Sequence, residues 1–439
     1  MTRRALLIVR GDLRSHTGWS RATRAIVDLL RPYFSAVFGI DLHFSPARSD
    51  LPAPFRLIRE RDIDLLADAG SQLTVLNMCM PHEFRHVPHA HNIGYFFWET
   101  DKPPVDWGWI EFCGLMDQLW VPTDWQRAVV ASWLPDNGAK DIRVIPWPHE
   151  ICEESKEPSQ GVNVHRILTH AELDDVGVQE EAIEARGHIP LIGARAIARG
   201  REQYQKMVLT ETACALDLAD PPGPIVFAVQ TDVPRKGLAV LLSEWLQFRC
   251  SHPDVVLLLK LSSIDVDKHT ATLHSWLSHM VRSARNRTIA SGDGIFACYE
   301  HLSDLSLATC YRASLCFISA TYGEGFGGPI VESVAAGTLP VVPTHTACAA
   351  LLPDGYPFGI ETNPVVGKLA GELPIYPASG RWHVPIEGAI AGRLSQLFST
   401  DSAMRTYWLQ ACRRHLRATL APDVVTPRIA DALLALERG

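Results

Sequence analysis

Residues 315–343 read LCFISATYGEGFGGPIVESVAAGTLPVVP, and this stretch decides the fold of the second half of the chain. Both of its ends are apolar runs of strand length, and a segment with helical spacing lies between them. The predicted elements are a strand at 315–319, a helix at 329–336 and a strand at 339–343. A helix between two buried strands is typical of an α/β domain built on a parallel sheet.

A glycine-rich turn joins the first of these strands to the helix. Its glycines are Gly323, Gly325, Gly327 and Gly328. They let the backbone approach a ligand closely, and Pro329 suits the first helical position, where no N–H is needed. The free N–H groups of that helix start favour a phosphate. Glu324 lies in the turn and Glu332 in the helix, and a carboxylate accepts hydrogen bonds from two hydroxyls, as a sugar or a ribose offers.

A second candidate segment, DVPRKG at 232–237, follows a strand predicted at 225–229 and precedes a helix predicted at 238–250. Alone, an R-K-G triplet is more typical of a helix start on the surface. Arg235 and Lys236 are nevertheless adjacent cations at a strand end, where they can hold a diphosphate. Both candidate segments lie at carboxyl ends of strands, where open α/β folds bind ligands.

The first half of the chain also reads as a doubly wound α/β domain. A strand at 5–9, a polar loop at 11–20 and helical spacing from Arg21 onward open it. Further strands are predicted at 73–78, 93–98, 118–121 and 142–145. We therefore expect an N-terminal domain at 1–220 that includes a helical insertion at about 153–220, a second domain at 221–405, and helices at 406–439 that can pack back on the first domain.

Composition narrows the class of protein. The 439 residues carry a net charge of -8, which gives no global attraction to nucleic acid. The first 31 residues are locally basic; their arginines, among them Arg21 and Arg24, either meet anionic phosphates or form a solvated helix face. Ten cysteines without a C-x-x-C pair favour a reducing cytoplasm. The apolar run near the N-terminus is too short for a signal peptide or a membrane span, although a peripheral contact with the inner face of a membrane stays open.

The segment YGEGFGGPIVESVAAGTLPVV, with PRKG upstream, resembles the retaining family-4 glycosyltransferases of the GT-B architecture. The segments HTGWSRATR, IGYFFWETDKPPVDW and LWVPTDWQRAVV resemble the N-terminal domain of the same family, in particular members whose acceptors are sugars on polysaccharide or lipid carriers. The resemblance implies two Rossmann-like domains facing a cleft. It also implies a hexosyltransferase that takes a nucleotide-sugar donor and a saccharide, lipid-linked or protein acceptor, retains the anomeric configuration, and needs neither a metal nor a cofactor.

By this resemblance Lys236 holds the donor diphosphate, Glu324 the donor sugar and Glu332 the ribose. Backbone amides near Phe326, Gly327 and Gly328 would face the sugar and the phosphate. Many members of the family carry an arginine five or six residues before the lysine, and this chain has Gln230 and Thr231 there. Arg235, or Lys260 at the end of the next strand, would have to supply the missing charge.

Weaker candidates come from the first half. Glu99 ends the aromatic segment IGYFFWE at 93–99. Carboxylates are seldom fully buried without a partner, so core packing explains Glu99 poorly, and it is a candidate acceptor-side residue and general base. Gly18 is a candidate for the donor site, although a helix start capped by Ser20 explains it equally well. The remaining acceptor-side candidates are His82, Trp98 and Thr123. Each also has a structural explanation: a structural role for the histidine, core packing for the tryptophan and a helix N-cap for the threonine. Pro88 interrupts the histidines around His82, so no metal site is predicted.

Two other functions stay open. Gly323, Gly325 and Gly328 formally match the G-x-G-x-x-G fingerprint of dinucleotide-dependent oxidoreductases. That fingerprint wants an acidic residue about 20 positions later, and the next strand leads into Thr344 and His345 instead. The absence of an arginine at Gln230 also permits a sugar-nucleotide-binding protein with weakened activity.

Overall fold

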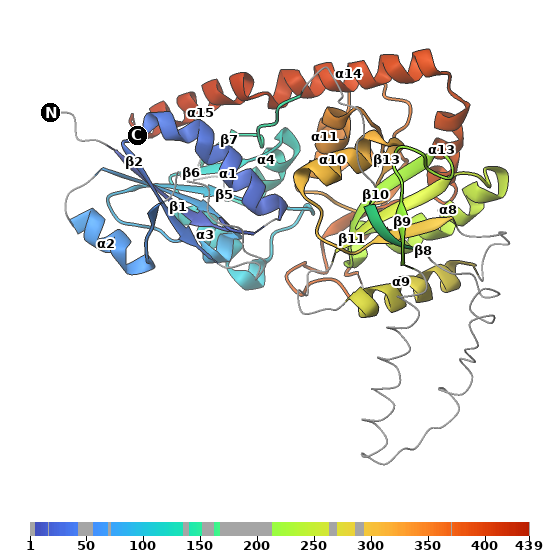
Figure 1. Cartoon of the computed structure of the whole chain (residues 1–439). Helices are drawn as coiled ribbons and strands as arrows, with labels where there is room; N and C mark the ends of the chain where they lie inside the picture. Colours follow the sequence, from blue (N-terminus) through green and yellow to red (C-terminus); the bar gives the residue numbers. More distant parts are fainter. Residues whose placement is uncertain are drawn as a thin grey trace, which may run out of the picture.

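Two α/β domains lie side by side in the computed structural model (Figure 1). The structure describes residues 5–15, 17–42, 56–68, 72–134, 140–151, 162–166, 213–262, 270–285, 294–369 and 371–438. The predicted fold class, two doubly wound Rossmann-like domains, is confirmed.

The first domain is built on a parallel sheet with the order β3-β2-β1-β4-β5-β6-β7. Its strands are β1 (Leu6–Gly11), β2 (Ala36–Asp41), β3 (Arg56–Leu57), β4 (Leu73–Met78), β5 (His91–Tyr95), β6 (Gln118–Val121) and β7 (Asp141–Val144). Helix α1 (Gly18–Leu30) packs on one face, and α2 (Glu60–Asp68), α3 (Trp109–Leu115) and α4 (Asp124–Ala131) pack on the other. The direction of chain progression reverses between β1 and β4, which makes that point the switch of the sheet.

The second domain has the order β14-β13-β10-β11-β12-β8-β9, in which the first five strands are parallel. These are β10 (Ile225–Thr231), β11 (Val256–Ser262), β12 (Ile295–Cys298), β13 (Ser314–Ile318) and β14 (Leu339–Val341). Helices α8 (Leu238–Ser251), α9 (Thr270–Arg285) and α13 (Ala389–Ser399) cover one face of the sheet. Helices α10 (Asp304–Arg312), α11 (Gly328–Ala336) and α14 (Ser402–Leu420) cover the other.

The segment at about 153–220, expected to be a helical insertion of the first domain, contains strands where the structure describes it. β8 (Val162–Arg166) and β9 (Ala213–Leu216) are strands, and they pair antiparallel at the edge of the second sheet. Most of the expected insertion, 167–212, lies outside the described residues. The two strands therefore belong to the second domain, although they precede the expected boundary at 220.

The C-terminal helices connect the domains. Helix α14 packs on α11 of the second domain, and α15 (Pro422–Leu436) then runs along α1 of the first (Figure 1). The Gln118 side chain at the start of β6 donates a hydrogen bond of 2.9 Å to the carbonyl of Ala432. In the described part of the chain, no helix combines the length and the apolar character needed to cross a membrane.

An antiparallel hairpin of the second domain contacts the first domain. Its strands are β15 (Thr362–Val366) and β16 (Arg381–Pro385). Trp382 of this hairpin and Tyr376 of its connecting loop are buried in the aromatic cluster of the first domain. The Tyr376 ring stacks on Trp98 with centroids 4.8 Å apart. The backbone N–H of Arg381 donates to Asp101 Oδ1 at 2.8 Å. The hairpin is thus an interdomain strap.

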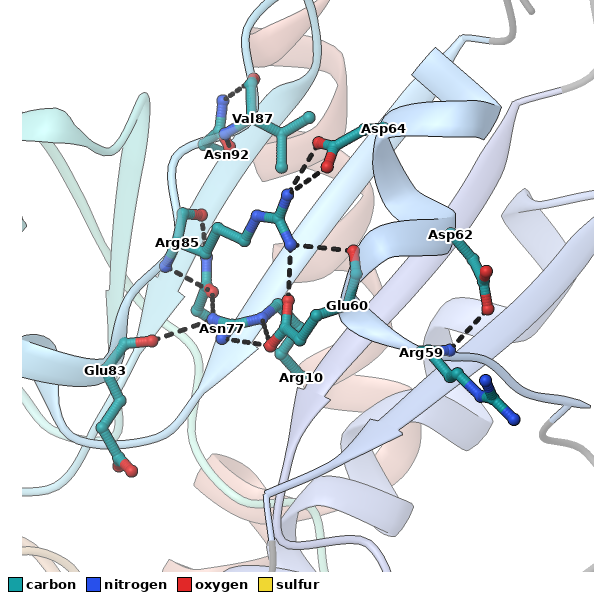
Figure 2. A network of polar contacts seen from close by, with 10 residues as sticks. All are labelled: Arg10, Arg59, Glu60, Asp62, Asp64, Asn77, Glu83, Arg85, Val87 and Asn92. Atoms are coloured by element: carbon teal, nitrogen blue, oxygen red, sulfur yellow. Dashed lines mark hydrogen bonds and ion pairs between the residues drawn. The ribbon is translucent and has the colours of Figure 1, made fainter. Parts of the chain in front are cut away.

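A polar network holds α2 against the carboxyl ends of β1 and β4 (Figure 2). Arg10 donates to Glu60 Oε1 at 2.6 Å and to Asn77 Oδ1 at 2.5 Å. Arg85 pairs with Glu60 and with Asp64, each at 2.7 Å. A buried guanidinium needs partners for its N–H groups, and this network supplies them to Arg10. Its donors and acceptors are engaged with one another, so we assign it a structural role.

Candidate functional site

The switch point of the second sheet lies between β10 and β13, because β11 and β12 extend the sheet on one side of β10 while β13 and β14 extend it on the other. Segments that follow these two strands meet at the carboxyl edge of the sheet. Lys236 follows β10 and Glu324 follows β13, and Lys236 Nζ lies 2.5 Å from Glu324 Oε1. The Glu324 side chain is only 13% exposed. The two segments singled out in the sequence therefore meet in a direct ion pair.

Glu332 lies on α11, beside the same edge, and both of its carboxylate oxygens are engaged. Arg21 Nη1, from α1 of the first domain, lies 2.9 Å from Glu332 Oε1. The Tyr311 hydroxyl donates to Glu332 Oε2 at 3.2 Å. Arg21 Nη1 also lies 3.6 Å from Asp304 Oδ1, whose side chain is 89% exposed. The Arg21–Glu332 pair therefore crosses from one domain to the other.

Glu99 forms a second ion pair between the domains. Arg235 Nη2 lies 3.2 Å from Glu99 Oε1, and the Tyr376 hydroxyl donates to Glu99 Oε2 at 2.9 Å. The backbone N–H of Arg235 donates to Glu372 Oε2 at 2.8 Å. The sequence suggested Glu99 as a general base. In the structure its two carboxylate oxygens are held by Arg235 and Tyr376, so in this arrangement Glu99 joins the domains.

The pKa values of these groups reflect burial and neighbouring charge. Burial raises the pKa of Glu99 and that of Glu332. Burial acts in the same direction on Glu324, but the charges of Lys236 and Arg235 outweigh it and lower the pKa of Glu324. Burial alone would lower the pKa of Arg235, yet the acidic groups around it, Glu99 first, raise it. The lowered pKa of Glu324 therefore favours its ionised carboxylate beside Lys236.

The glycine turn is pressed against the first domain. A Cβ on Gly323 would lie 2.5 Å from the Glu99 carbonyl oxygen, and one on Gly325 would lie 2.7 Å from Phe97 Cβ. Both contacts are too close for any larger residue. The sequence assigned these glycines to the approach of a ligand, whereas in the structure they make room for the backbone that follows β5.

The start of α11 also meets the first domain. Gly327 is its N-cap, with a φ of 92° that favours glycine, and a Cβ on Gly328 would lie 2.9 Å from Trp147 Cζ3. The ring of Phe326 is buried, with its centroid 5.4 Å from that of Trp147. The amides expected to face a donor phosphate therefore lie beside the indole of Trp147.

A strained residue holds the backbone of Glu324. Thr346 has a φ of 48°, an uncommon value for a β-branched side chain. Its hydroxyl accepts from the Glu324 N–H at 3.2 Å, while the Ala347 N–H donates to the Glu324 carbonyl at 3.3 Å. The sequence gives no sign of this strain, because only the folded backbone shows it.

The first-half candidates occupy structural positions. Gly18 begins α1, and Thr17, rather than Ser20, is the cap: its hydroxyl accepts from the Ser20 N–H at 3.2 Å. His82 accepts a hydrogen bond from Trp109 Nε1 at 3.0 Å, which gives this histidine a structural role. Thr123 is the N-cap of α4. Trp98, already described, is fully buried under Tyr376. Among the described residues, none of these four forms a hydrogen bond or an ion pair with Lys236 or Glu324.

Gln230 and Lys260 lie on opposite faces of the second sheet. Side chains alternate along a strand, and the neighbours Val226 and Ala228 face the cluster under α8, so Gln230 faces it too. Its amide atoms are buried without a hydrogen-bond partner among the described residues. Lys260 pairs in register with Val229 and faces the α10 side. Burial lowers the pKa of Lys260.

Solved structures with this architecture are known. The chain matches the sucrose-phosphate synthase of Thermosynechococcus elongatus with a TM-score of 0.62, at 13% identity over 99% of this chain and 100% of that one. It matches the UDP-forming α,α-trehalose-phosphate synthase of Burkholderia vietnamiensis with a TM-score of 0.55, at 14% identity over 98% and 99%. The trehalose-6-phosphate protein of E. coli bound with UDP-2-fluoro glucose gives 0.57, at 13% identity over 97% and 98%.

The chain has the GT-B fold. At these identities the likeness concerns the fold alone. A scan against protein-family models gives no match, and neither does a search of curated proteins.

The GT-B arrangement also bears on the dinucleotide fingerprint. The first strand–helix turn of the second domain, between β10 and α8, contains Lys236, whereas the G-x-G-x-x-G match follows β13. In dinucleotide-binding domains that fingerprint occupies the first βα turn. The glycines here also contact the first domain, so the position of the match disfavours an oxidoreductase.

Proposed function

We propose that this chain is a glycosyltransferase that moves a hexose from a nucleotide-sugar donor to a hydroxyl of a saccharide, lipid-linked or protein acceptor, with retention and without a metal ion. The observation that carries the proposal is the Lys236–Glu324 pair at the switch point, with Glu332 on the helix that follows. One protein of the same fold holds UDP-2-fluoro glucose and another is UDP-forming, which supports a nucleotide-sugar donor.

In this proposal each charged group has a defined task. Lys236 stabilises the negative charge that grows on the leaving diphosphate, and the N–H groups at the start of α11 add to it. Glu324 accepts hydrogen bonds from the donor sugar and fixes Lys236, and Glu332 accepts from the ribose. The proton of the acceptor hydroxyl passes to a phosphate oxygen of the donor. Glu99 is left out of the proton transfer because both of its oxygens are engaged.

The test is the release of nucleoside diphosphate from a panel of UDP-, GDP- and ADP-sugars in excess EDTA. We expect slow release with water and faster release with a saccharide acceptor, and we expect Lys236→Ala to abolish both. Glu361→Ala, an exposed change in the same domain, is the control. Release that returns only after Mg²⁺ or Mn²⁺ is added would refute charge stabilisation by Lys236. Donor binding without any release would favour the weakened binding protein.

A further inference from the structure

Arg21 is a cation of the first domain that reaches into the nucleotide side of the second. It lies in the first half of α1 and pairs with Glu332 of α11 at 2.9 Å. Its second acidic neighbour, Asp304, is almost fully exposed, so that contact is screened by solvent. The Glu332 pair is therefore the main interaction that holds this guanidinium.

The neighbouring Arg24 is hydrogen-bonded to the start of α1 and to the loop that precedes it. Its Nη1 donates to the Ser20 hydroxyl at 2.5 Å and to the carbonyls of Leu13 and Ser15 at 3.3 Å. The charge of Arg21 adds to burial in lowering the pKa of Arg24, so the two cations lie close enough to repel. An anion beside Arg21 would relieve this repulsion.

The surroundings of Arg21 include the place where a donor phosphate is expected. Gly18, one turn before Arg21, and Gly328, at the start of α11, both border the Trp147 ring, with Cβ positions 3.9 and 2.9 Å from Cζ3. The two helices therefore begin at the same indole. Arg21 lies next to the first turns of α11, whose free N–H groups favour a phosphate.

The cations on the β10 side are already engaged. Lys236 pairs with Glu324, and Arg235 pairs with Glu99. Gln230 faces the cluster under α8 and carries no charge, so it adds no cation to this edge of the sheet. A diphosphate carries at least two negative charges, and a single lysine leaves part of that charge without a partner.

We propose that Arg21 exchanges partners when the donor binds: the ribose hydroxyls take over Glu332, and the Arg21 guanidinium pairs with the donor diphosphate. This inference rests on the proposed function and assigns the second diphosphate cation to the opposite domain. The exchange couples nucleotide binding to the contact between the domains, because the same arginine serves both.

The exchange predicts different effects of one substitution on the affinities for two ligands. Arg21→Ala frees Glu332, so the affinity for a bare nucleoside should stay equal or rise. The same variant removes a cation from the diphosphate, so the affinity for the nucleoside diphosphate should fall roughly tenfold, the size expected for one charge-assisted hydrogen bond. Arg21→Lys should recover part of that loss, since it keeps the charge without the fork geometry.

The experiment is calorimetry with UDP, GDP and ADP and their nucleosides. Arg31→Ala, an exposed arginine at the other end of α1, is the matched control, and thermal unfolding checks that each variant is folded. Equal losses for nucleoside and diphosphate would show that Arg21 only holds the domains together and would overturn the exchange, as would an unchanged diphosphate affinity. If the wild-type protein binds none of these ligands and no nucleotide sugar, the proposed function itself fails, and this inference fails with it.

Discussion

Glu324 and Glu332 should differ in what their loss costs. Glu324→Ala removes the proposed sugar contact, so it should abolish transfer while nucleoside diphosphate binding changes less than about threefold, well under the cost of one hydrogen bond to a charged group. Glu332→Ala removes the proposed ribose contact, so it should weaken both. Calorimetry with the bare nucleoside diphosphate decides between them. Equal losses of nucleotide affinity in the two variants would refute this division of labour.

A buried histidine beside Glu324 predicts a pH effect on stability. His345 is 6% exposed and stacks on His383, and burial lowers its pKa from 6.5 to about 3, with the charge of His383 acting in the same direction. Between these two pH values the unfolded chain binds a proton that the folded chain does not. The free energy of unfolding should therefore fall as the pH falls through this window, by at most about 1.4 kcal/mol per pH unit from this group.

His345→Asn should remove that share of the pH dependence, because asparagine keeps an acceptor near Thr346 but does not titrate. Urea unfolding of the two proteins at pH 7 and pH 5 measures the difference. Burial also lowers the pKa of His82 and His383, so the comparison rests on the change in slope and not on the slope itself. Parallel pH profiles for the two proteins would contradict the prediction.

The residues of the site differ in how visible they are in the sequence. Lys236 and Glu324 could be brought together in advance, since each follows a predicted strand of one sheet and parallel strands end at one edge. Arg21 could be noticed only as one of several arginines. Its partner Glu332 lies 311 positions away and in the other domain, and no local pattern specifies such a contact.

The strap formed by β15 and β16 offers a prediction for an element. Tyr376→Phe keeps the stack on Trp98 but leaves Glu99 Oε2 without its donor. A hydrogen bond to a buried charged group contributes about 1.5–3 kcal/mol, so the variant should lose stability of that order. Tyr407→Phe, at an exposed tyrosine of α14, is the matched control. Urea unfolding checks the result, and equal stability of the two variants would show that the Tyr376–Glu99 hydrogen bond does not stabilise the strap.

Three strands that the sequence missed give weak signals for physical reasons. β8 and β9 lie at the edge of their sheet, with partly exposed residues that lack the continuous apolar run of a buried strand. β3 has only two residues, too few for any periodicity. The central strands β1, β4, β10 and β13 were predictable because both of their faces are covered.

For the whole molecule, the sequence predicts two domains but not how firmly they are joined. One apolar cluster includes side chains of both sheets, and it continues through Trp147 and Phe326 between them. Two ion pairs, Arg21–Glu332 and Arg235–Glu99, cross the same boundary. Each of these contacts joins segments far apart in the sequence, so hydrophobic patterning, which is local, does not reveal them.

The return of α15 to the first domain has a consequence for the order of synthesis. The carbonyl of Ala432 accepts from Gln118, and α15 covers α1, so the first domain lacks one of its own helices until the second domain has been made. Roughly 300 residues separate β6 from α15, which at 5–20 residues per second is on the order of 15–60 seconds of translation. During that interval the apolar residues of α1 that later contact α15 stay uncovered.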